Sequence, residues 1–98
     1  TGFDCSGYVC WVYNQNGYDV GRTTANGLWQ KSQHISEAEA KPGDLVFFKG
    51  TYDTPGMSHT GIYLGNGMMV SAGDPIKYAN IHSSYWQKYL SGFGRLSK

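Results

Sequence analysis

The chain has 98 residues, of which 40% are hydrophobic and 15% aromatic, and its formal net charge is +1. This length suits one small domain spanning residues 1–98, and the apolar content is enough for a core, which excludes a disordered chain. The balanced charge, without a run of Lys or Arg, argues against a nucleic-acid partner and a polybasic membrane surface. The sequence contains neither an apolar stretch of membrane-spanning length nor a signal peptide. Because it begins at Thr1, we expect a domain taken from a longer protein.

The first predicted element is a helix from about Asp4 to Asn16. Asp4 is a favourable N-cap residue, and Asn16-Gly17 is a plausible C-terminal stop. One helical face would carry Cys5, Val9, Val12 and Tyr13. Cys5 then lies in the first turn, where free backbone N–H groups and the helix dipole favour an anion. This environment lowers a thiol pKa and makes the nucleophilic thiolate available.

The cysteines also have plainer interpretations. A cysteine in an apolar-rich sequence can be a small buried hydrophobe, and this alternative applies to Cys5. Cys5 and Cys10 are five positions apart on one helix, so their side chains diverge and we expect no disulfide between them. Cys10 is predicted to pack in the core. The sequence has no C-x-x-C or H-x-x-x-H pair, so we expect neither a metal nor another cofactor.

A second helix is predicted to start at Arg22-Thr23-Thr24, with a threonine as its cap. One face of this helix would carry Ala25, Leu28 and Trp29, although Gly27 weakens the pattern. The polar and acidic segment 33–41 is expected to be a surface connection.

The second half of the chain predicts an antiparallel meander. Pro42-Gly43-Asp44 is a turn, and the apolar run 45–48 is typical of a central strand. Gly65-Asn66-Gly67 is a hairpin signal between two strands. The expected elements are strands at 60–64, 68–72, 76–81 and 92–96, with a short helix capped by serine at 83–90. Helices followed by an antiparallel sheet indicate an α+β fold.

His59 is the second candidate for chemistry. It follows a loop containing Gly, Pro and Asp and precedes the strand at 60–64, a position from which a side chain can be presented to solvent. A cysteine with a distant histidine is the general pattern of a thiol hydrolase, and the spacing alone is weak support.

Three segments make the pattern specific: FDCSGYV at 3–9, KPGDLVFF at 41–48 and SHTGIYLG at 58–65. In this order they closely resemble the NlpC/P60 family of cell-wall cysteine peptidases, over nearly the whole chain. The resemblance implies a compact papain-like fold, with the cysteine helix packed on an antiparallel sheet whose first strand is 45–48. Family members carry a Tyr-x-Trp-Gly-Gly-like stretch before the cysteine motif, so we expect this domain to lack its leading segment.

The resemblance also implies a catalytic site. Cys5 would be the nucleophile and His59 the proton carrier, with a third polar residue orienting the imidazole. In the family this residue is most often His, Asn or Gln on the strand after the hairpin, and the matching position here is Ser71. Three interpretations stay open. Ser71 serves directly or through water, or a neighbouring residue (Asn80, Asp74 or His82) replaces it, or the site is weakened.

The implied substrate is a peptidoglycan stem peptide, cut between γ-linked D-glutamate or D-isoglutamine and the following diamino acid. The resemblance assigns substrate contacts to Asp4, Ser6, Thr23, Thr24 and Ser58. Asp4 can equally act as the N-cap of the first helix. The threonines, which follow Gly21-Arg22 where the family often has Pro-Arg, can equally cap the second helix.

The family further implies a bacterial protein acting outside the cell at the wall, and a monomer. A glycan-cleaving domain can precede such a domain in the same chain. Two alternative functions remain: a non-catalytic wall-binding module on the same fold, and an amidase or acyltransferase using the same Cys-His pair. His34 and His82 have no motif around them and are expected to be ordinary surface histidines.

Overall fold

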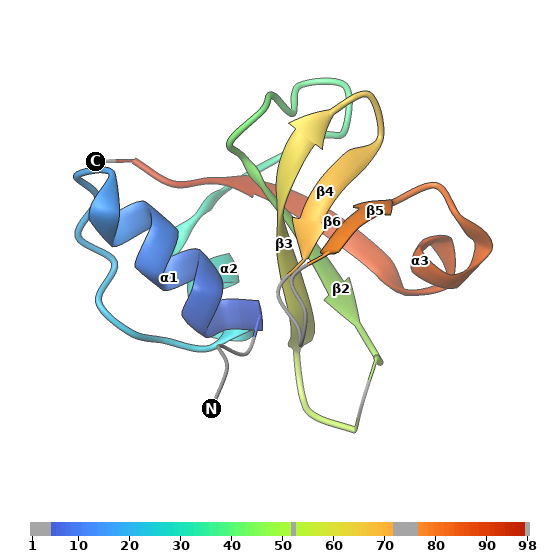
Figure 1. The fold of residues 1–98 in the computed structure, drawn as a ribbon. Helices are drawn as coiled ribbons and strands as arrows, with labels where there is room; N and C mark the ends of the chain where they lie inside the picture. Colours follow the sequence, from blue (N-terminus) through green and yellow to red (C-terminus); the bar gives the residue numbers. More distant parts are fainter. Residues whose placement is uncertain (1–4, 52, 72–76, 98) are drawn as a thin grey trace.

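The computed structural model describes residues 5–51, 53–71 and 77–97 of the chain. Its helices are α1 (Cys5–Gln15), α2 (Ala25–Lys31) and α3 (Ser84–Tyr89). Its strands are β1 (Gln33–Ile35), β2 (Leu45–Lys49), β3 (Met57–Gly65), β4 (Met68–Ser71), β5 (Lys77–Asn80) and β6 (Leu90–Arg95). Figure 1 shows α1 and α2 on one side of the sheet and α3 on the other. This arrangement confirms the predicted α+β class.

The sheet has the strand order β1-β6-β2-β3-β4-β5, and each of its pairings is antiparallel. The central strand β2 is buried on both faces. Leu45 and Phe47 face the core beneath α1 and α2, and Val46 and Phe48 face the core beside α3. A strand covered on both faces needs apolar residues at successive positions, which explains the continuous run LVFF.

The two N-terminal helices follow their local signals. α1 ends where predicted, and Gly17 beyond it adopts a φ of 87°, a left-handed conformation that glycine favours. The Thr24 side chain accepts a hydrogen bond from the Gly27 backbone N–H at 3.0 Å and so caps α2. Cys10 is a free thiol with 1% of its surface exposed, which confirms the prediction that it packs in the core.

The hairpin between β3 and β4 is also confirmed. Asn66 and Gly67 have φ angles of 53° and 78°. Positive values at both central residues fit a type I′ turn, whose twist matches that of the two strands it joins.

Three expectations need correction. Residues 33–35 are not part of a surface connection but form β1, which pairs with β6 at the edge of the sheet. The segment was missed because an exposed edge strand needs no alternation of apolar residues. The strand that follows, β2, is therefore second rather than first in chain order. Ser83 occupies the N-cap position of α3, but its side chain makes no capping hydrogen bond.

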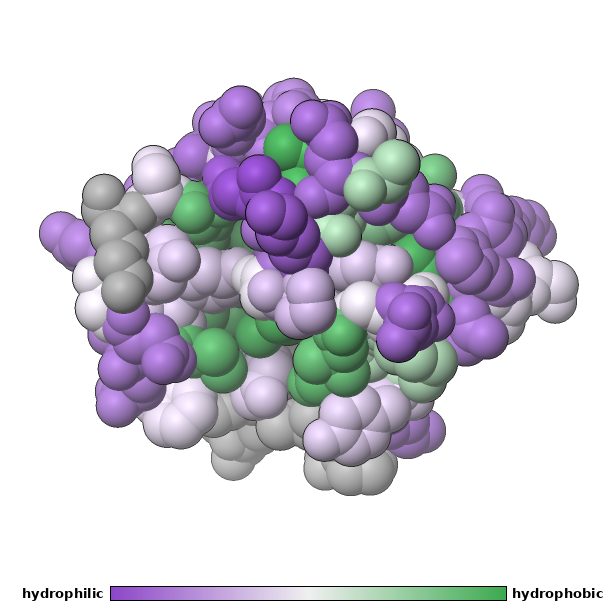
Figure 2. Space-filling model, turned by 90° about the horizontal axis from the view of Figure 1, so that it is seen from above, coloured by the Kyte–Doolittle hydropathy of each residue, from purple (hydrophilic) through white to green (hydrophobic). Residues whose placement is uncertain are grey.

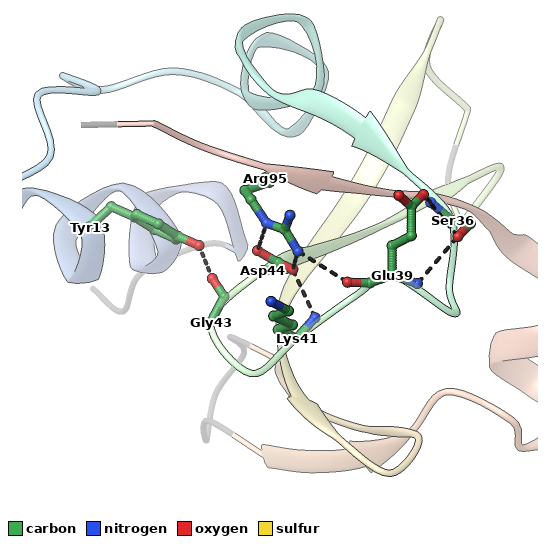
Figure 3. A network of polar contacts seen from close by, with 7 residues as sticks. All are labelled: Tyr13, Ser36, Glu39, Lys41, Gly43, Asp44 and Arg95. Atoms are coloured by element: carbon green, nitrogen blue, oxygen red, sulfur yellow. Dashed lines mark hydrogen bonds and ion pairs between the residues drawn. The ribbon is translucent and has the colours of Figure 1, made fainter.

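A polar network joins the start of β2 to β6 (Figure 3). The buried Asp44 carboxylate accepts hydrogen bonds from Arg95 Nε at 3.0 Å and Arg95 Nη2 at 2.8 Å. It also accepts one from the Lys41 backbone N–H at 2.8 Å. Arg95 Nη2 donates in addition to the Glu39 carbonyl, and its hydrogen bonds to Asp44 raise the pKa of the guanidinium. The network fixes the connection that leads into β2.

An apolar hollow of about 190 Å³ lies near the C-terminal end of α1. Its lining residues are Val12, Tyr13, Asn16, Tyr18, Gly43 and Ile62. Figure 2, a view from above Figure 1, shows small separate apolar areas within a mainly polar face. The hollow is distant from the start of α1, where Cys5 lies.

Candidate functional site

A β-bulge at the start of β3 sets the direction of the His59 side chain. The register pairs Phe48 with His59 and Lys49 with Met57, so Ser58 is an extra residue on β3, as in a β-bulge. Met57 packs in the core beneath α1 and α2, whereas the His59 ring lies beside Phe48, which belongs to the core on the other face. Without the bulge, residues 57 and 59 would point to the same face.

The imidazole of His59 is held by a hydrogen bond and by aromatic rings. Its Nε2 lies 2.7 Å from Ser71 Oγ on β4. Its ring stacks on the indole of Trp86 from α3, with centroids 5.0 Å apart and planes inclined by 27°. The Phe48 ring is 5.7 Å away. The ring is half-buried, so its orientation is constrained while part of its surface remains accessible.

A close approach of two strands allows the short serine side chain to reach His59. Gly61 on β3 lies directly opposite Ser71 on β4. A Cβ atom at Gly61 would lie 2.8 Å from Met69 Sδ and 2.9 Å from the Val70 carbonyl oxygen. A larger residue at position 61 would therefore displace β4, the strand that carries Ser71.

The electrostatics of the site favour a neutral imidazole. Burial lowers the pKa of His59 to about 4, so the ring is uncharged at neutral pH. In the tautomer that carries its proton on Nε2, His59 donates to Ser71 Oγ and keeps the Nδ1 lone pair. In this tautomer His59 can therefore accept a proton at Nδ1 while its Nε2 is held by the hydrogen bond to Ser71.

The helix that begins with Cys5 and the strand that carries His59 approach each other at one end of the molecule. α1 and β3 are in contact, and both begin at the lower end in Figure 1. Cys5 is the first residue of α1, but its side chain and the whole of Asp4 lie outside what the structure describes. Ser6, in the same turn, is buried.

Ser58 is 1% exposed, and its polar partners lie within the fold. Its Oγ accepts a hydrogen bond from the Thr51 backbone N–H at 3.1 Å, lies 2.6 Å from Thr51 Oγ1, and is 3.4 Å from the Phe48 carbonyl oxygen. These contacts hold the bulge against the loop that precedes β3. A contact between Ser58 and substrate stays a prediction.

Thr23 and Thr24 lie where α2 begins. Thr24 caps the helix, and the Thr23 side chain lies against Gly27, where an added Cβ would be 2.0 Å from Thr23 Oγ1. Gly27, which weakened the helix prediction, thus makes room for Thr23. The Arg22 guanidinium donates to the Thr23 carbonyl oxygen at 2.8 Å. The capping interpretation of Thr24 is confirmed, and a role for either threonine in substrate binding stays a prediction.

The other residues considered as partners of His59 have different contacts. Asn80 Oδ1 accepts a hydrogen bond from the His82 backbone N–H at 2.8 Å, and His82 Nε2 lies 2.5 Å from Glu37 Oε2. Asp74 lies outside the described residues. Both remaining histidines are exposed, with His34 stacked on Trp29. Of the three described candidates, Ser71, Asn80 and His82, Ser71 is the one that the structure places against the His59 ring.

Two contributions to the site were missed from the sequence. Trp86 lies in a short helix far along the chain, and nothing in its local sequence relates it to His59. Asn26 Oδ1 accepts a hydrogen bond from the Met57 backbone N–H at 3.0 Å and so ties α2 to the first residue of β3. Neither contact has a sequence signal, because both depend on how distant elements pack.

The described residues include no group of three His, Cys, Asp or Glu side chains placed to hold a metal ion. In the same parts of the chain, every helix is too short or too polar to cross a membrane.

Comparison with known proteins places these features in a family. The NlpC/P60 family model matches residues 1–95. The "Probable endopeptidase p60" of Listeria monocytogenes is 52% identical over 97 residues, which are 98% of this chain and 19% of that protein. The "Bifunctional muramidase/DL-endopeptidase CwlT" of Bacillus subtilis is 46% identical, over 98% of this chain and 29% of that protein. The chain thus spans less than a third of either relative.

Solved structures agree with the fold. A crystal structure from Staphylococcus aureus, described as similar to lipoprotein of the NLP/P60 family, superposes with a TM-score of 0.92 at 41% identity. The match covers 98% of this chain and 32% of that one. RipD from Mycobacterium tuberculosis, described as a non-catalytic NlpC/p60 domain protein adapted to peptidoglycan binding, has a TM-score of 0.78 at 24% identity, over 99% of this chain and 69% of its own. The fold by itself therefore does not decide between catalysis and binding.

Proposed function

The chain belongs to the NlpC/P60 family, and we propose that it is a cysteine endopeptidase domain that hydrolyses peptidoglycan stem peptides. The bond cut is that between γ-linked D-glutamate or D-isoglutamine and the following diamino acid. One observation carries the proposal: His59, near the start of β3, is neutral and hydrogen-bonded to Ser71. The helix α1, whose first residue is Cys5, begins near the same end of β3. The name of the Bacillus subtilis relative, a DL-endopeptidase, supports this bond class.

The proposed reaction has two steps. The neutral His59 takes the proton of the Cys5 thiol as the thiolate forms. The Cys5 thiolate attacks the carbonyl carbon of the γ-glutamyl amide, the C–N bond breaks, and the protonated His59 gives its proton to the leaving amine. A water molecule then attacks the thioester, and His59 takes up the proton of that water. The C–S bond breaks, the γ-carboxyl group is released, and His59 returns its proton to the departing sulfur, which restores the Cys5 thiol and the neutral imidazole.

The other groups assist these two residues. Ser71 holds the imidazole in one orientation through Nε2, and the backbone N–H groups at the start of α1 bind the oxyanion. The N-terminal end of a helix favours the thiolate, because free N–H groups and the positive end of the dipole meet there.

Substrate contacts are proposed for Asp4, Ser6, Thr23, Thr24 and Ser58. Asp4 and Ser6 flank the nucleophile and would hold the amino-terminal side of the stem peptide. The threonines lie at the start of α2, a helix that contacts β3. Ser58 would act by supporting the strand next to His59, since its side chain is buried and hydrogen-bonded to Thr51.

The site of action follows from the substrate. We propose that the domain works as a monomer outside the bacterial cell at the wall, and that residues 1–98 belong to one domain. The Bacillus subtilis relative is named a muramidase as well as an endopeptidase, which supports a glycan-cleaving domain in the same chain as this one.

A second candidate is a non-catalytic wall-binding module. It is favoured by Ser71, which stands where family members most often have His, Asn or Gln, and by the description of RipD. An amidase or acyltransferase acting on another acyl group would use the same Cys5 and His59.

Digestion of purified muropeptides separates these functions. The domain and its Cys5→Ala variant are incubated with disaccharide peptides, and the products are read by mass spectrometry. Cleavage after the γ-glutamyl residue, lost in Cys5→Ala, is the expected result. Intact muropeptides that co-sediment with both proteins would instead establish the binding module, and cleavage at the bond between sugar and peptide would establish an amidase.

A further inference from the structure

The third helix makes one substantial contact with the site. α3 has six residues, and its Trp86 side chain stacks on the ring of His59. Trp86 is half-buried, 5.0 Å from the His59 ring and 4.7 Å from the Phe48 ring by centroid distance. Tyr85 meets the Trp86 indole edge-on at 4.8 Å. The Trp86 indole is therefore packed between the Tyr85 ring on its own helix and the rings of His59 and Phe48.

We infer that Trp86 is a positioning residue for His59, which rests on the proposed function in which His59 carries the proton. The nearly parallel indole covers one face of the imidazole and restricts rotation about its Cβ–Cγ bond. Nε2 then keeps its hydrogen bond to Ser71, and Nδ1 holds the same position in each catalytic cycle. Fixed geometry of this kind contributes to rate because a misplaced proton carrier must be reoriented before reaction.

The need for a second constraint follows from Ser71 itself. A single hydrogen bond from a hydroxyl fixes one atom of the ring but leaves the ring plane free to rock, because the χ2 torsion of histidine has a broad minimum. Offset stacking on an indole restricts the plane. The hydrogen bond and the stack together define the orientation that neither would define alone.

The position of α3 does not depend on the indole alone. Gln87 Nε2 donates to the Ile81 carbonyl oxygen at 2.9 Å, and the Gln87 backbone N–H donates to the Ser83 carbonyl oxygen at 2.9 Å. The side chains of Tyr89 and Leu90 also pack on the core formed by Val46 and Phe48. Removal of the indole is therefore expected to leave the helix in place.

Trp86 also excludes water from the ring. Among the described residues, burial is the cause of the lowered His59 pKa, and no neighbouring charge contributes to it. The titratable side chains on the elements that flank the ring are Lys49 on β2, Tyr63 on β3, and Tyr85, Lys88 and Tyr89 on α3; the described part of α1 adds Tyr8, Cys10 and Tyr13. Exposure of the ring by loss of the indole should therefore raise its pKa toward 6.5.

The first test is independent of activity. In the Cys5→Ala background, nitrogen NMR of the His59 ring gives its pKa and its tautomer with and without Trp86→Ala. We expect a pKa near 4 and one tautomer with the indole, and a pKa at least one unit higher with mixed tautomers without it. Trp86→Phe should keep most of the original behaviour, and Lys88→Ala, on the same helix, should keep all of it. An unchanged pKa and tautomer in a folded Trp86→Ala protein would overturn the inference.

The second test uses the protein with Cys5 intact. Trp86→Ala should lower kcat on muropeptides by about 10- to 100-fold, with KM within about 3-fold, whereas Trp86→Phe should recover most of the rate. Equal kcat values for wild type and Trp86→Ala would overturn the inference. A wild type that cleaves no muropeptide would overturn the proposed function instead, and the NMR comparison would still decide whether Trp86 orients the ring. If circular dichroism shows that Trp86→Ala is unfolded, Trp86→Met, which keeps volume without a ring, takes its place with the same expected results.

Discussion

The two ends of the central strand β2 carry polar groups of opposite character. Before its first residue, Asp44 and Arg95 form a charged pair joined by two hydrogen bonds, and the Lys41 backbone N–H adds a third (Figure 3). Beside its far end, the neutral imidazole of His59 forms a hydrogen bond with Ser71 and, within the described parts of the chain, otherwise contacts the aromatic rings of Phe48 and Trp86. Both oxygens of the Asp44 carboxylate accept hydrogen bonds, whereas no described residue forms a hydrogen bond with the second ring nitrogen of His59.

This difference separates a polar group that stabilises the fold from one that can react. A buried carboxylate with all its hydrogen bonds made has no capacity left for a substrate, and loss of one partner is costly. A buried histidine whose pKa has been lowered by desolvation has a lone pair available at neutral pH. Substitutions at the two ends should therefore have opposite effects on stability and activity.

The largest expected effect is on activity, at the imidazole. His59→Gln should reduce the rate of muropeptide hydrolysis by about 1,000-fold, because the leaving amine loses its proton donor. The free energy of unfolding at pH 7 should change little, since an amide of similar size replaces a neutral ring. Chromatography of digestion products and urea denaturation measure the two quantities. A variant that keeps a tenth of the activity would remove His59 from the catalytic pair.

At the Asp44–Arg95 pair, by contrast, the expected effect is on stability and not on activity. Asp44→Asn should lower the free energy of unfolding by about 2 kcal/mol, because the buried carboxylate loses its charge-assisted hydrogen bonds to Arg95. The folded variant should retain its hydrolytic rate, since the pair lies at the opposite end of β2 from His59. Urea denaturation and the same digestion assay check the prediction, with the exposed Asp19→Asn as a matched control. Unchanged stability would show that the pair is not a stabilising contact.

A smaller effect on rate is expected at the partner of His59. Ser71→Ala should slow turnover by about 10-fold, because the ring loses its hydrogen bond but keeps its aromatic contacts. Ser71→His, which restores a side chain common in the family at this position, should keep or raise the rate. Steady-state kinetics of both variants give the answer. If Ser71→Ala has the wild-type rate, another residue must orient the ring.

The smallest expected effect is the pH dependence of stability. The pKa of His59 is near 6.5 in the unfolded chain and about 4 in the folded one, so the unfolded state binds the proton more tightly. The contribution of this group is fully present above pH 6.5 and is lost progressively as the pH falls toward 4. Urea denaturation at pH 7 and pH 4.5 should show a smaller loss for His59→Gln than for wild type. Equal losses would mean that the ring is as accessible to protons as in the unfolded chain.

Local sequence determined much of the fold. The N-terminal helix, the cap of α2 at Thr24, the buried strand at 45–48 and the hairpin at Asn66-Gly67 each depend on residues within a few positions of one another. Propensity, capping and turn conformation act over this range, so such elements can be predicted from the chain alone. Motif resemblance added the candidate residues Cys5 and His59 and the alternatives for the third position.

Contacts between distant segments were decided only by the tertiary structure. The pairing of β1 with β6 creates a strand that has no pattern of its own. The bulge at Ser58 sets the direction of His59, and the close approach at Gly61 brings Ser71 rather than Asn80 or His82 to its ring. The stack of Trp86 on His59 joins positions 27 residues apart, and the pair of Asp44 and Arg95 joins positions 51 apart. Such contacts depend on how strands and helices pack, and the sequence near each residue carries no signal for them.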